Sequence, residues 1–231
     1  MFHIDEIIYF DTPGPQNTDK VIDAIAKRIS RGDIKYIIVA SITGETALKI
    51  ATRIKDLQLD AKVICVSGPP QWDCEMMGRK WPYIQGEIRK KLKDLNVEIV
   101  ERAAVTLAGG SVDYSLARYG FIPPSWVLLE TLVMIGGYGL KTAIEVTLMA
   151  TDYGAVPPFV EAIAVAGTLN KGADTAIVVK TTYSPHIFSS NSNKRMQVLE
   201  ILAMPRNKRW YREMSVWECR TEEVKKGEYL E

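Results

Sequence analysis

The segment Ser41-Ile-Thr-Gly-Glu-Thr46 combines hydroxyl side chains with a glycine, between a β-branched run at 36–40 and an amphipathic pattern over 47–57. The first N–H groups of a helix have no intrahelical partner, and with the helix dipole they favour an anion. The segment therefore predicts a phosphate-binding loop, although it lacks both the GK[ST] ending of a Walker A loop and the GxGxxG pattern. The alternative from spacing alone is that Thr43 caps the helix and Gly44 makes a tight turn.

A second polar, glycine-containing segment, Gly167-Thr-Leu-Asn-Lys-Gly-Ala-Asp174, separates two strand-like runs. Its glycines could let the backbone approach a ligand, and Lys171 could supply a cation. The alternative is a glycine-rich turn with an exposed lysine, and spacing alone favours that turn.

Acid-base candidates are few. Glu145, Met149 and Asp152 share one face of an expected helix, and the two carboxylates lie about 10 Å apart at the helical rise, too far to share a proton. We therefore expect a solvated face or structural hydrogen bonds there. His186 is the plausible histidine acid or base, but without an identifiable partner a structural role is favoured.

Aromatic side chains gather in the irregular stretch 67–83, where Trp72, Trp81 and Tyr83 could stack on a planar ligand. We favour the alternative that they anchor this long loop to the core. A basic cluster near Trp210 resembles a nucleic-acid element, but acidic residues follow closely, which favours a solvated or subunit-contacting surface.

Overall composition excludes several classes of protein. The 29 Lys and Arg residues nearly balance the 28 Asp and Glu residues, so no global charge would attract nucleic acid or an acidic membrane. The longest apolar stretch, 126–135, contains Glu130 and is shorter than a membrane span, and no secretory signal is visible. The three cysteines lack CxxC spacing and only two histidines are present, so we expect neither a structural zinc site nor a His-rich metal centre, and we expect a cytoplasmic protein. A magnesium site made of carboxylates alone stays open, but no motif supports it.

Strand-like and helix-like patterns alternate along most of the chain. This order predicts an α/β fold, a three-layer, doubly wound and mostly parallel sheet with antiparallel edge pairing in the C-terminal third. Expected strands lie at 6–10, 36–40, 62–66, 97–100, 161–166, 175–181 and 196–204. Ligands of such sheets bind beyond the carboxyl ends of the strands, here the loops 11–18, 41–46, 167–174 and the one that starts at Ser67. We expect a single phosphate-ligand-binding α/β domain over 1–209 and a charged C-terminal extension over 210–231.

Several patches together resemble a known family. They are Pro13-Gly14 with Asn17-Thr18, Val39-Ala40-Ser41 with Gly44, Thr46 and Ala47, Glu145-Val-Thr-Leu-Met-Ala150 with Asp152, Gly154, Ala155 and Pro157, Val165, Gly167, Gly172-Ala-Asp-Thr-Ala176, and Met204-Pro-Arg-Asn-Lys-Arg209. Spread over residues 5–209, they resemble the stand-alone archaeal proteins similar to the C-terminal α/β domain of pyruvate kinase. The stretch 67–83, rich in Trp and Pro, and the tail beyond residue 209 depart from that pattern.

The resemblance implies a binding function. In pyruvate kinase the corresponding domain does no chemistry, and a loop like 41–46 holds a phosphate of the allosteric sugar bisphosphate. The barrel that carries the kinase active site has no counterpart in this sequence, so pyruvate kinase activity is not expected. Stand-alone relatives look like binders of flavin mononucleotide (FMN). A functional flavin would imply redox chemistry, but neither catalytic residues nor an electron donor can be named.

The leading hypothesis is therefore a protein that binds FMN, with its phosphate at the 41–46 loop. The expected phosphate contacts are Ser41, Thr43, Gly44, Glu45 and Thr46, the last three mainly through backbone N–H. Weaker candidates for the ribityl chain and ring are Asn17, Ser67, Gly109, Gly110, Gly167, Gly172 and Asp174. The alternatives are a non-catalytic sensor of a sugar phosphate or nucleotide, and a structural subunit with an empty pocket. Assembly into a homo-oligomer stays open.

Overall fold

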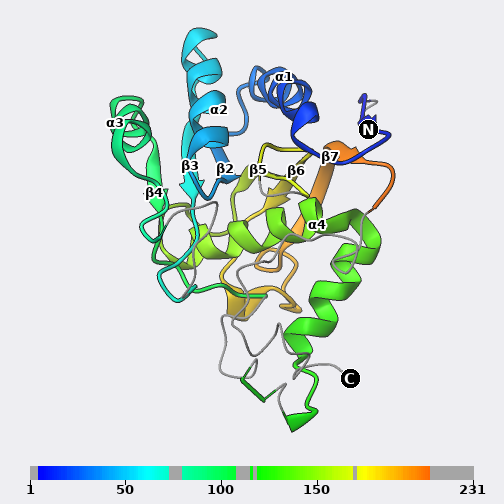
Figure 1. The fold of residues 1–231 in the computed structure, drawn as a ribbon. Coiled ribbons are helices and arrows are strands. Elements are labelled where there is room, and N and C mark those ends of the chain that lie inside the picture. The colour runs from blue at the N-terminus through cyan, green and yellow to red at the C-terminus, as the bar shows by residue number, and fades with distance from the viewer. Residues whose placement is uncertain (1–4, 73–79, 108–114, 117–118, 169–170, 209–231) are drawn as a thin grey trace.

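The computed structural model describes residues 5–72, 80–107, 115–116, 119–168 and 171–208 (Figure 1). Its strands form one seven-stranded sheet in the order β1-β7-β6-β5-β2-β3-β4. They are β1 (Ile8–Phe10), β2 (Tyr36–Ala40), β3 (Lys62–Val66), β4 (Glu98–Val100), β5 (Glu161–Ala166), β6 (Thr175–Lys180) and β7 (Gln197–Pro205). The helices are η1 (Pro15–Asn17), α1 (Thr18–Ile29), α2 (Glu45–Asp56), α3 (Gly86–Asp94), α4 (Pro124–Asp152) and η3 (Ser184–His186).

Six of the strands run in one direction, and β6 runs against both of its neighbours. The α/β class and the mostly parallel sheet are therefore confirmed. The expectation that antiparallel pairing lies at an edge is wrong, because β6 is an interior strand. The first strand of the chain, β1, adds in parallel to β7 and closes that edge.

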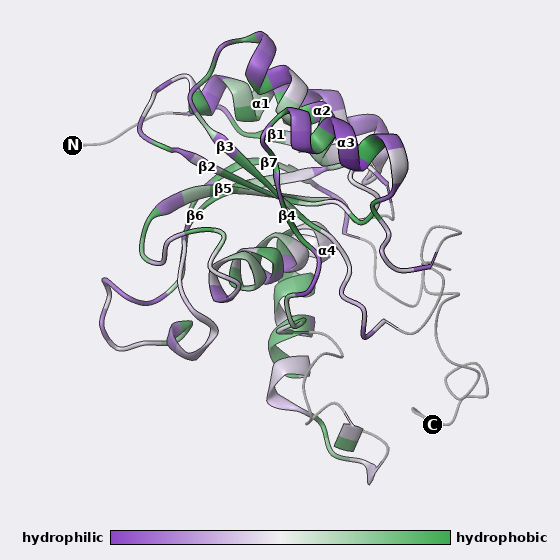
Figure 2. Cartoon of the chain, turned by 90° about the vertical axis from the view of Figure 1, so that its left-hand side faces the viewer, coloured by the Kyte–Doolittle hydropathy of each residue, from purple (hydrophilic) through white to green (hydrophobic). Residues whose placement is uncertain are grey.

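Helices cover both faces of the sheet (Figure 2). The α1, α2 and α3 helices lie on one face, where Ile25, Ile50 and Leu92 are buried in a shared apolar core. The α4 helix crosses the other face, with Val146 and Met149 in a second core cluster. The β-branched runs of the strands fill the layer between, because a sheet covered on both faces is apolar on both.

The α4 helix changes direction at Gly137, whose φ of 76° lies in the region that glycine tolerates. The half before this kink extends away from the sheet, and the half after it lies under the sheet (Figures 1 and 2). By length and composition α4 could cross a membrane, but half of its most apolar window is buried inside the protein. The buried half also carries an ion pair between Lys141 and Glu145. The half of α4 after the kink is therefore part of the core of this α/β fold.

Arg28 joins two distant parts of the chain. Its side chain is only 5% exposed, and its guanidinium pairs with Asp33 at 2.7 Å and with Glu200 of β7 at 2.7 Å. Hydrogen bonds to both carboxylates raise the pKa of Arg28, so the group stays charged although buried. The α1 helix is thereby fixed to β7.

Candidate functional site

The sheet reverses its winding between β2 and β5. These strands are adjacent and parallel, with Val39 opposite Val165. From β2 the chain continues to β3 on one side, and from β5 it continues to β6 on the other. Such a switch point is where ligands bind in doubly wound sheets. The loops 41–44 and 167–174 flank it.

Two serines hold the first of these loops in place. Ser41 donates its N–H to the Val66 carbonyl at 2.9 Å, and its hydroxyl accepts a long bond of 3.4 Å from the Ala47 N–H. Ser67 donates its hydroxyl to the Ile42 carbonyl at 2.7 Å. Both serines lie where the sequence predicts the site, and both use their hydroxyls to shape the loop.

Gly44 makes the turn into α2. Its φ is 84°, its N–H donates to the Ser41 carbonyl at 3.2 Å, and it is the N-cap of the helix. A Cβ atom at this position would lie 2.9 Å from both Ile88 Cγ2 and Leu92 Cδ1 of α3. Glycine therefore suits both the turn and the packing here. The N–H groups of Glu45 and Thr46, the first two of α2, have no intrahelical acceptor.

Two threonine hydroxyls accompany these donors. Thr43 is 9% exposed and Thr46 is 7% exposed. Within the described part of the chain neither hydroxyl forms a hydrogen bond, and both oxygens keep contact with solvent. Polar groups in such buried positions normally have partners. A ligand that reaches the start of α2 would therefore meet these two hydroxyls and the first N–H groups of the helix, which have no intrahelical acceptor.

The second loop is different, because its carboxylate is used inside the protein. Asp174 is fully buried and accepts hydrogen bonds from the Gly14 N–H at 3.0 Å, the Thr168 N–H at 3.1 Å and the Thr175 hydroxyl at 3.0 Å. Burial raises the pKa of Asp174, and these hydrogen bonds oppose the rise. Asp174 therefore joins the loop after β5 to the loop after β1.

The glycines of this loop are also explained by contacts within the protein. A Cβ on Gly172 would lie 2.4 Å from the Thr18 hydroxyl oxygen, and one on Gly167 would lie 2.7 Å from the Gly172 carbonyl oxygen. The Thr18 hydroxyl accepts from the Ala173 N–H at 3.0 Å. Asn17 donates its side-chain amide to the Thr12 carbonyl at 2.8 Å. The expected ribityl and ring candidates that the structure describes thus gather at the carboxyl end of the parallel strands, but their polar groups hold the loops together.

Some expected site residues cannot be placed. Gly109 and Gly110 lie outside the described residues, as does the part of the basic cluster beyond Lys208.

The aromatic side chains are anchors, as predicted. Tyr83 is fully buried and donates its hydroxyl to the Trp72 carbonyl at 3.0 Å. The Trp81 indole N–H donates to the Glu101 carbonyl at 3.4 Å, and the Arg102 guanidinium lies 5.1 Å from the centre of the Trp81 ring.

The carboxylates of α4 have structural partners. Glu145 accepts from the Leu107 N–H at 3.0 Å and pairs with Lys141 at 2.9 Å, and it is buried, so a solvated face is wrong for this residue. Asp152 accepts from the Ser184 N–H at 2.9 Å. His186 packs beside Phe159, with ring centres 6.4 Å apart. Structural hydrogen bonds were the other expectation for the carboxylates, and they are confirmed.

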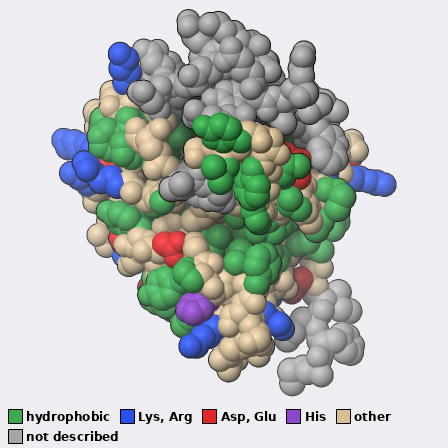
Figure 3. All heavy atoms as spheres, turned by 90° about the horizontal axis from the view of Figure 1, so that it is seen from below, with side chains coloured by type: hydrophobic (Ala, Val, Ile, Leu, Met, Phe, Trp, Pro, Cys, Tyr) green, Lys and Arg blue, Asp and Glu red, His purple; other side chains and the backbone are tan. Residues whose placement is uncertain are grey.

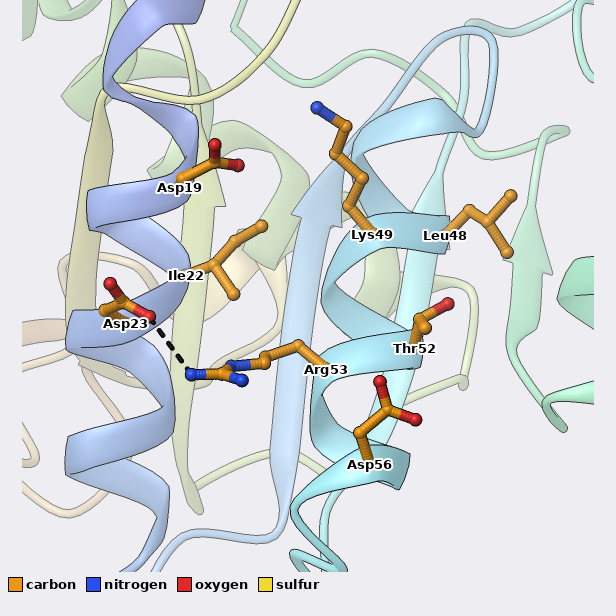
Figure 4. Close-up of a pocket in the computed structure, with 8 residues that line it drawn as sticks. All are labelled: Asp19, Ile22, Asp23, Leu48, Lys49, Thr52, Arg53 and Asp56. Carbon is orange, nitrogen blue, oxygen red and sulfur yellow. Dashed lines mark hydrogen bonds and ion pairs between the residues drawn. The ribbon is translucent and has the colours of Figure 1, made fainter.

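Two hollows of the surface lie away from these loops. A groove of about 490 Å³ runs between α1 and α2, where Arg53 pairs with Asp23 at 3.4 Å (Figure 4). Lys49 and Asp19 lie toward one end of it, so its lining carries both signs of charge and selects no single type of ligand. A second hollow of about 370 Å³ lies between α4 and the segment 187–198. Neither is lined by the loops at the switch point.

The site offers hydrogen-bond donors for an anion. Among the described residues, no group of three or more His, Cys, Asp or Glu side chains could hold a metal ion. Cys65 is buried, and burial raises the pKa of its thiol to about 12, so it is not a ready nucleophile. No family model matches the sequence, so the geometry at the carboxyl ends of β2 and β5 is what bears on function.

Proposed function

We propose that this protein binds a phosphorylated ligand, FMN, with the phosphate at the start of α2. One observation carries the proposal. At the switch point of the sheet, the hydroxyls of Thr43 and Thr46 have no partner among the described residues, and the first N–H groups of α2 are not bonded within the helix. Phosphate oxygens are strong acceptors, and such a donor set is complementary to them.

The surroundings of the loop strengthen this preference. The α2 dipole places partial positive charge at its N-terminus, which stabilises an anion by up to about 2 kcal/mol in a partly buried position. Ile84, Ile88 and Leu92 pack beside Gly44 and keep that side apolar, which strengthens hydrogen bonds made there. The Glu45 side chain is exposed, so its charge is solvated while its N–H faces the end of the helix.

FMN is the ligand we propose because the patches around residues 13–18, 39–47 and 165–176 resemble the stand-alone proteins similar to the C-terminal domain of pyruvate kinase. Those proteins look like FMN binders. The ring would then lie against the loops that follow the neighbouring strands. Asp174 holds two of these together, which gives a bound ring a fixed surface. When bound, a flavin supplies redox chemistry. We propose further that the protein is cytoplasmic and has no pyruvate kinase activity.

The first test identifies the ligand. Small molecules released by denaturing the purified protein are measured by absorbance and mass, and the ligand-free protein is titrated with FMN and with riboflavin, which lacks the phosphate. Hydrogen bonds to a charged group contribute about 1.5–3 kcal/mol each, so FMN should bind at least about tenfold more tightly than riboflavin.

A matched pair of variants locates the phosphate. Thr46→Val removes a hydroxyl at the start of α2 at nearly constant shape, and Thr52→Val does the same on an exposed part of the same helix. We expect roughly tenfold weaker FMN binding for Thr46→Val, with riboflavin unaffected, and no change for Thr52→Val. Binding of a sugar phosphate or nucleotide instead of FMN would disprove the proposal that the ligand is a flavin, and would favour the sensor. A protein that binds none of these ligands would disprove the phosphate site.

A further inference from the structure

The half of α4 before its kink, residues 124–136, presents an apolar stripe to solvent, and we call this half the arm. Val127, Met134 and Ile135 are 57%, 59% and 60% exposed, and with exposed Thr131 they follow the spacing i, i+4, i+7, i+8 of one helical face. Val133 and Gly136, on the opposite side, are buried. Figure 3 shows apolar side chains gathered on this side of the molecule. Within the described part of the chain, nothing covers the stripe.

The charge of the arm points to an apolar protein surface as its partner. Glu130 is its charged side chain, and it accepts a hydrogen bond from the Trp126 indole at 3.3 Å. The chain has no Lys or Arg from Tyr119 to Leu140. Helices that lie on membranes carry Lys and Arg on their polar face, so a membrane surface is a poor match for this arm.

The described chain ends beside this arm. Lys208 is its last residue, and a Cβ on Gly137 would lie 3.3 Å from Lys208 Cδ. Gly137 is the kink from which the arm extends, so the last described residue lies at the root of the arm.

The sequence of this extension contains an apolar stripe of its own. Trp210, Met214, Trp217, Thr221 and Val224 follow the spacing i, i+4, i+7, i+11, i+14, which lies on one face of a helix. Arg212, Cys219 and Lys226 fall on the opposite face. A helix over 210–224 and the arm would each be roughly 20 Å long at 1.5 Å per residue.

We propose that residues 210–224 form an amphipathic helix that packs on the exposed stripe of the arm in the same chain. The pairing is antiparallel, because the chain starts at the kink and must run back toward Pro124. Matching the stripes in this direction places Met214 opposite Met134, Trp217 opposite Thr131 and Thr221 opposite Val127. The extension would then complete the core around α4. This inference does not depend on the proposed function.

Cysteine crosslinking tests the pairing directly. The variant Val127→Cys/Thr221→Cys is made in a Cys74→Ser/Cys219→Ser background, and the control carries Val127→Cys with native Cys219 and with Cys74→Ser. A disulfide needs Cα atoms about 4.4–6.8 Å apart. We expect a disulfide within one chain for the first variant and none for the control, as seen by mass and by gel mobility under mild oxidation. A disulfide between two copies only, equal crosslinking of the control, or no crosslinking would each overturn the proposal.

Limited proteolysis gives an independent measurement that leaves the cysteines untouched. Trp217→Glu places a charge in the stripe, and Ser215→Glu places one outside it. We expect tryptic cleavage after Arg220 to be roughly tenfold faster in Trp217→Glu than in the wild type, the change that a loss of about 1.4 kcal/mol of docking free energy produces. The Ser215→Glu rate should match the wild type. Equal rates in all three proteins would contradict the docked helix.

Discussion

The loops 41–46 and 167–174 look alike in sequence and differ in how their polar groups are used. Both contain glycine and hydroxyl residues, and both follow neighbouring parallel strands. In the first, Thr43 and Thr46 keep their hydroxyls free of partners among the described residues. In the second, Asp174 and the Ala173 N–H are bonded within the protein. Unpartnered polar groups therefore distinguish the candidate site at 41–46 from the structural loop at 167–174, and the residue types of the two loops alone do not show this difference.

The different destinations of the two loops explain this contrast. The loop 41–46 leads into α2, and a helix cannot satisfy its own first N–H groups. The loop 167–174 leads into β6, which turns back beside β5. Its described residues therefore lie over the end of the sheet, where Gly172 packs on Pro15 and Thr18.

The largest effect is expected from Asp174→Ala. It would leave two N–H groups and a hydroxyl without a buried acceptor, so the free energy of unfolding should fall by about 3–5 kcal/mol. Urea denaturation measures the loss, and Asp174→Asn, which keeps one acceptor oxygen, should lose less. A loss below about 1 kcal/mol for Asp174→Ala would contradict the role of Asp174 as the link between the loops after β1 and β5.

The next effect is expected from Gly44→Val. The positive φ and the contact with Ile88 and Leu92 should together destabilise the fold by about 2–4 kcal/mol. Gly32 is the matched control, because its φ is 83° and nothing lies within 4 Å of a Cβ there. Gly32→Val should show only the backbone part, about 1 kcal/mol, in the same urea experiment. Equal losses at the two positions would mean that packing on α3 does not constrain Gly44.

A smaller effect separates the threonines of the two loops. Thr18→Val removes a hydroxyl that accepts from the Ala173 N–H and donates to the Pro15 carbonyl, and should cost about 1–3 kcal/mol of stability. Thr43→Val should change stability by less than about 0.5 kcal/mol, because no partner is lost. Thermal unfolding of the two variants without ligand measures both. A cost for Thr43→Val as large as that for Thr18→Val would erase the contrast between the loops.

The smallest effect concerns pH. Burial raises the pKa of Asp174 above its value in the unfolded chain, so the folded state binds the proton more tightly. The stabilisation from this proton is complete below the unfolded pKa and is lost as the pH rises through the folded pKa. The unfolding free energy of the wild type relative to Asp174→Asn should therefore increase as the pH is lowered from about 7 toward 4. A decrease over that range would mean that the hydrogen bonds outweigh burial.

Local patterns in the sequence are sufficient to predict most of the helices and strands and the end of the sheet where the candidate site lies. The runs 36–40 and 62–66 are β2 and β3 as predicted, because buried parallel strands are continuously apolar. The amphipathic pattern that starts at Glu45 is α2. Because the carboxyl ends of parallel strands lie at the same end of a sheet, the loops after β1, β2 and β5 gather at that end.

Contacts between distant residues could not be predicted in this way. Periodicity predicts that β6 is a strand, but it does not show that β6 lies in the interior of the sheet. That position depends on β7, which lies beside β6, and on β1, which pairs with β7 from the other end of the chain. The partner of Asp174 at Gly14, and the bonds of Arg28 to Glu200, likewise join residues far apart in sequence. Whether a polar group is free or bonded depends on such contacts, which is why Asp174 and Thr43 could not be told apart.

If Thr43 and Thr46 bind a phosphate, these two threonines must set the ratio of FMN to riboflavin affinity. The ratio is measured by fluorescence titration for the wild type and for the double variant Thr43→Val/Thr46→Val, with Thr52→Val as control. We expect a ratio of at least about ten for the wild type and the control, and a ratio that falls toward one in the double variant. Equal affinity for the two flavins in the wild type, or an unchanged ratio in the double variant, would contradict phosphate binding by these two threonines.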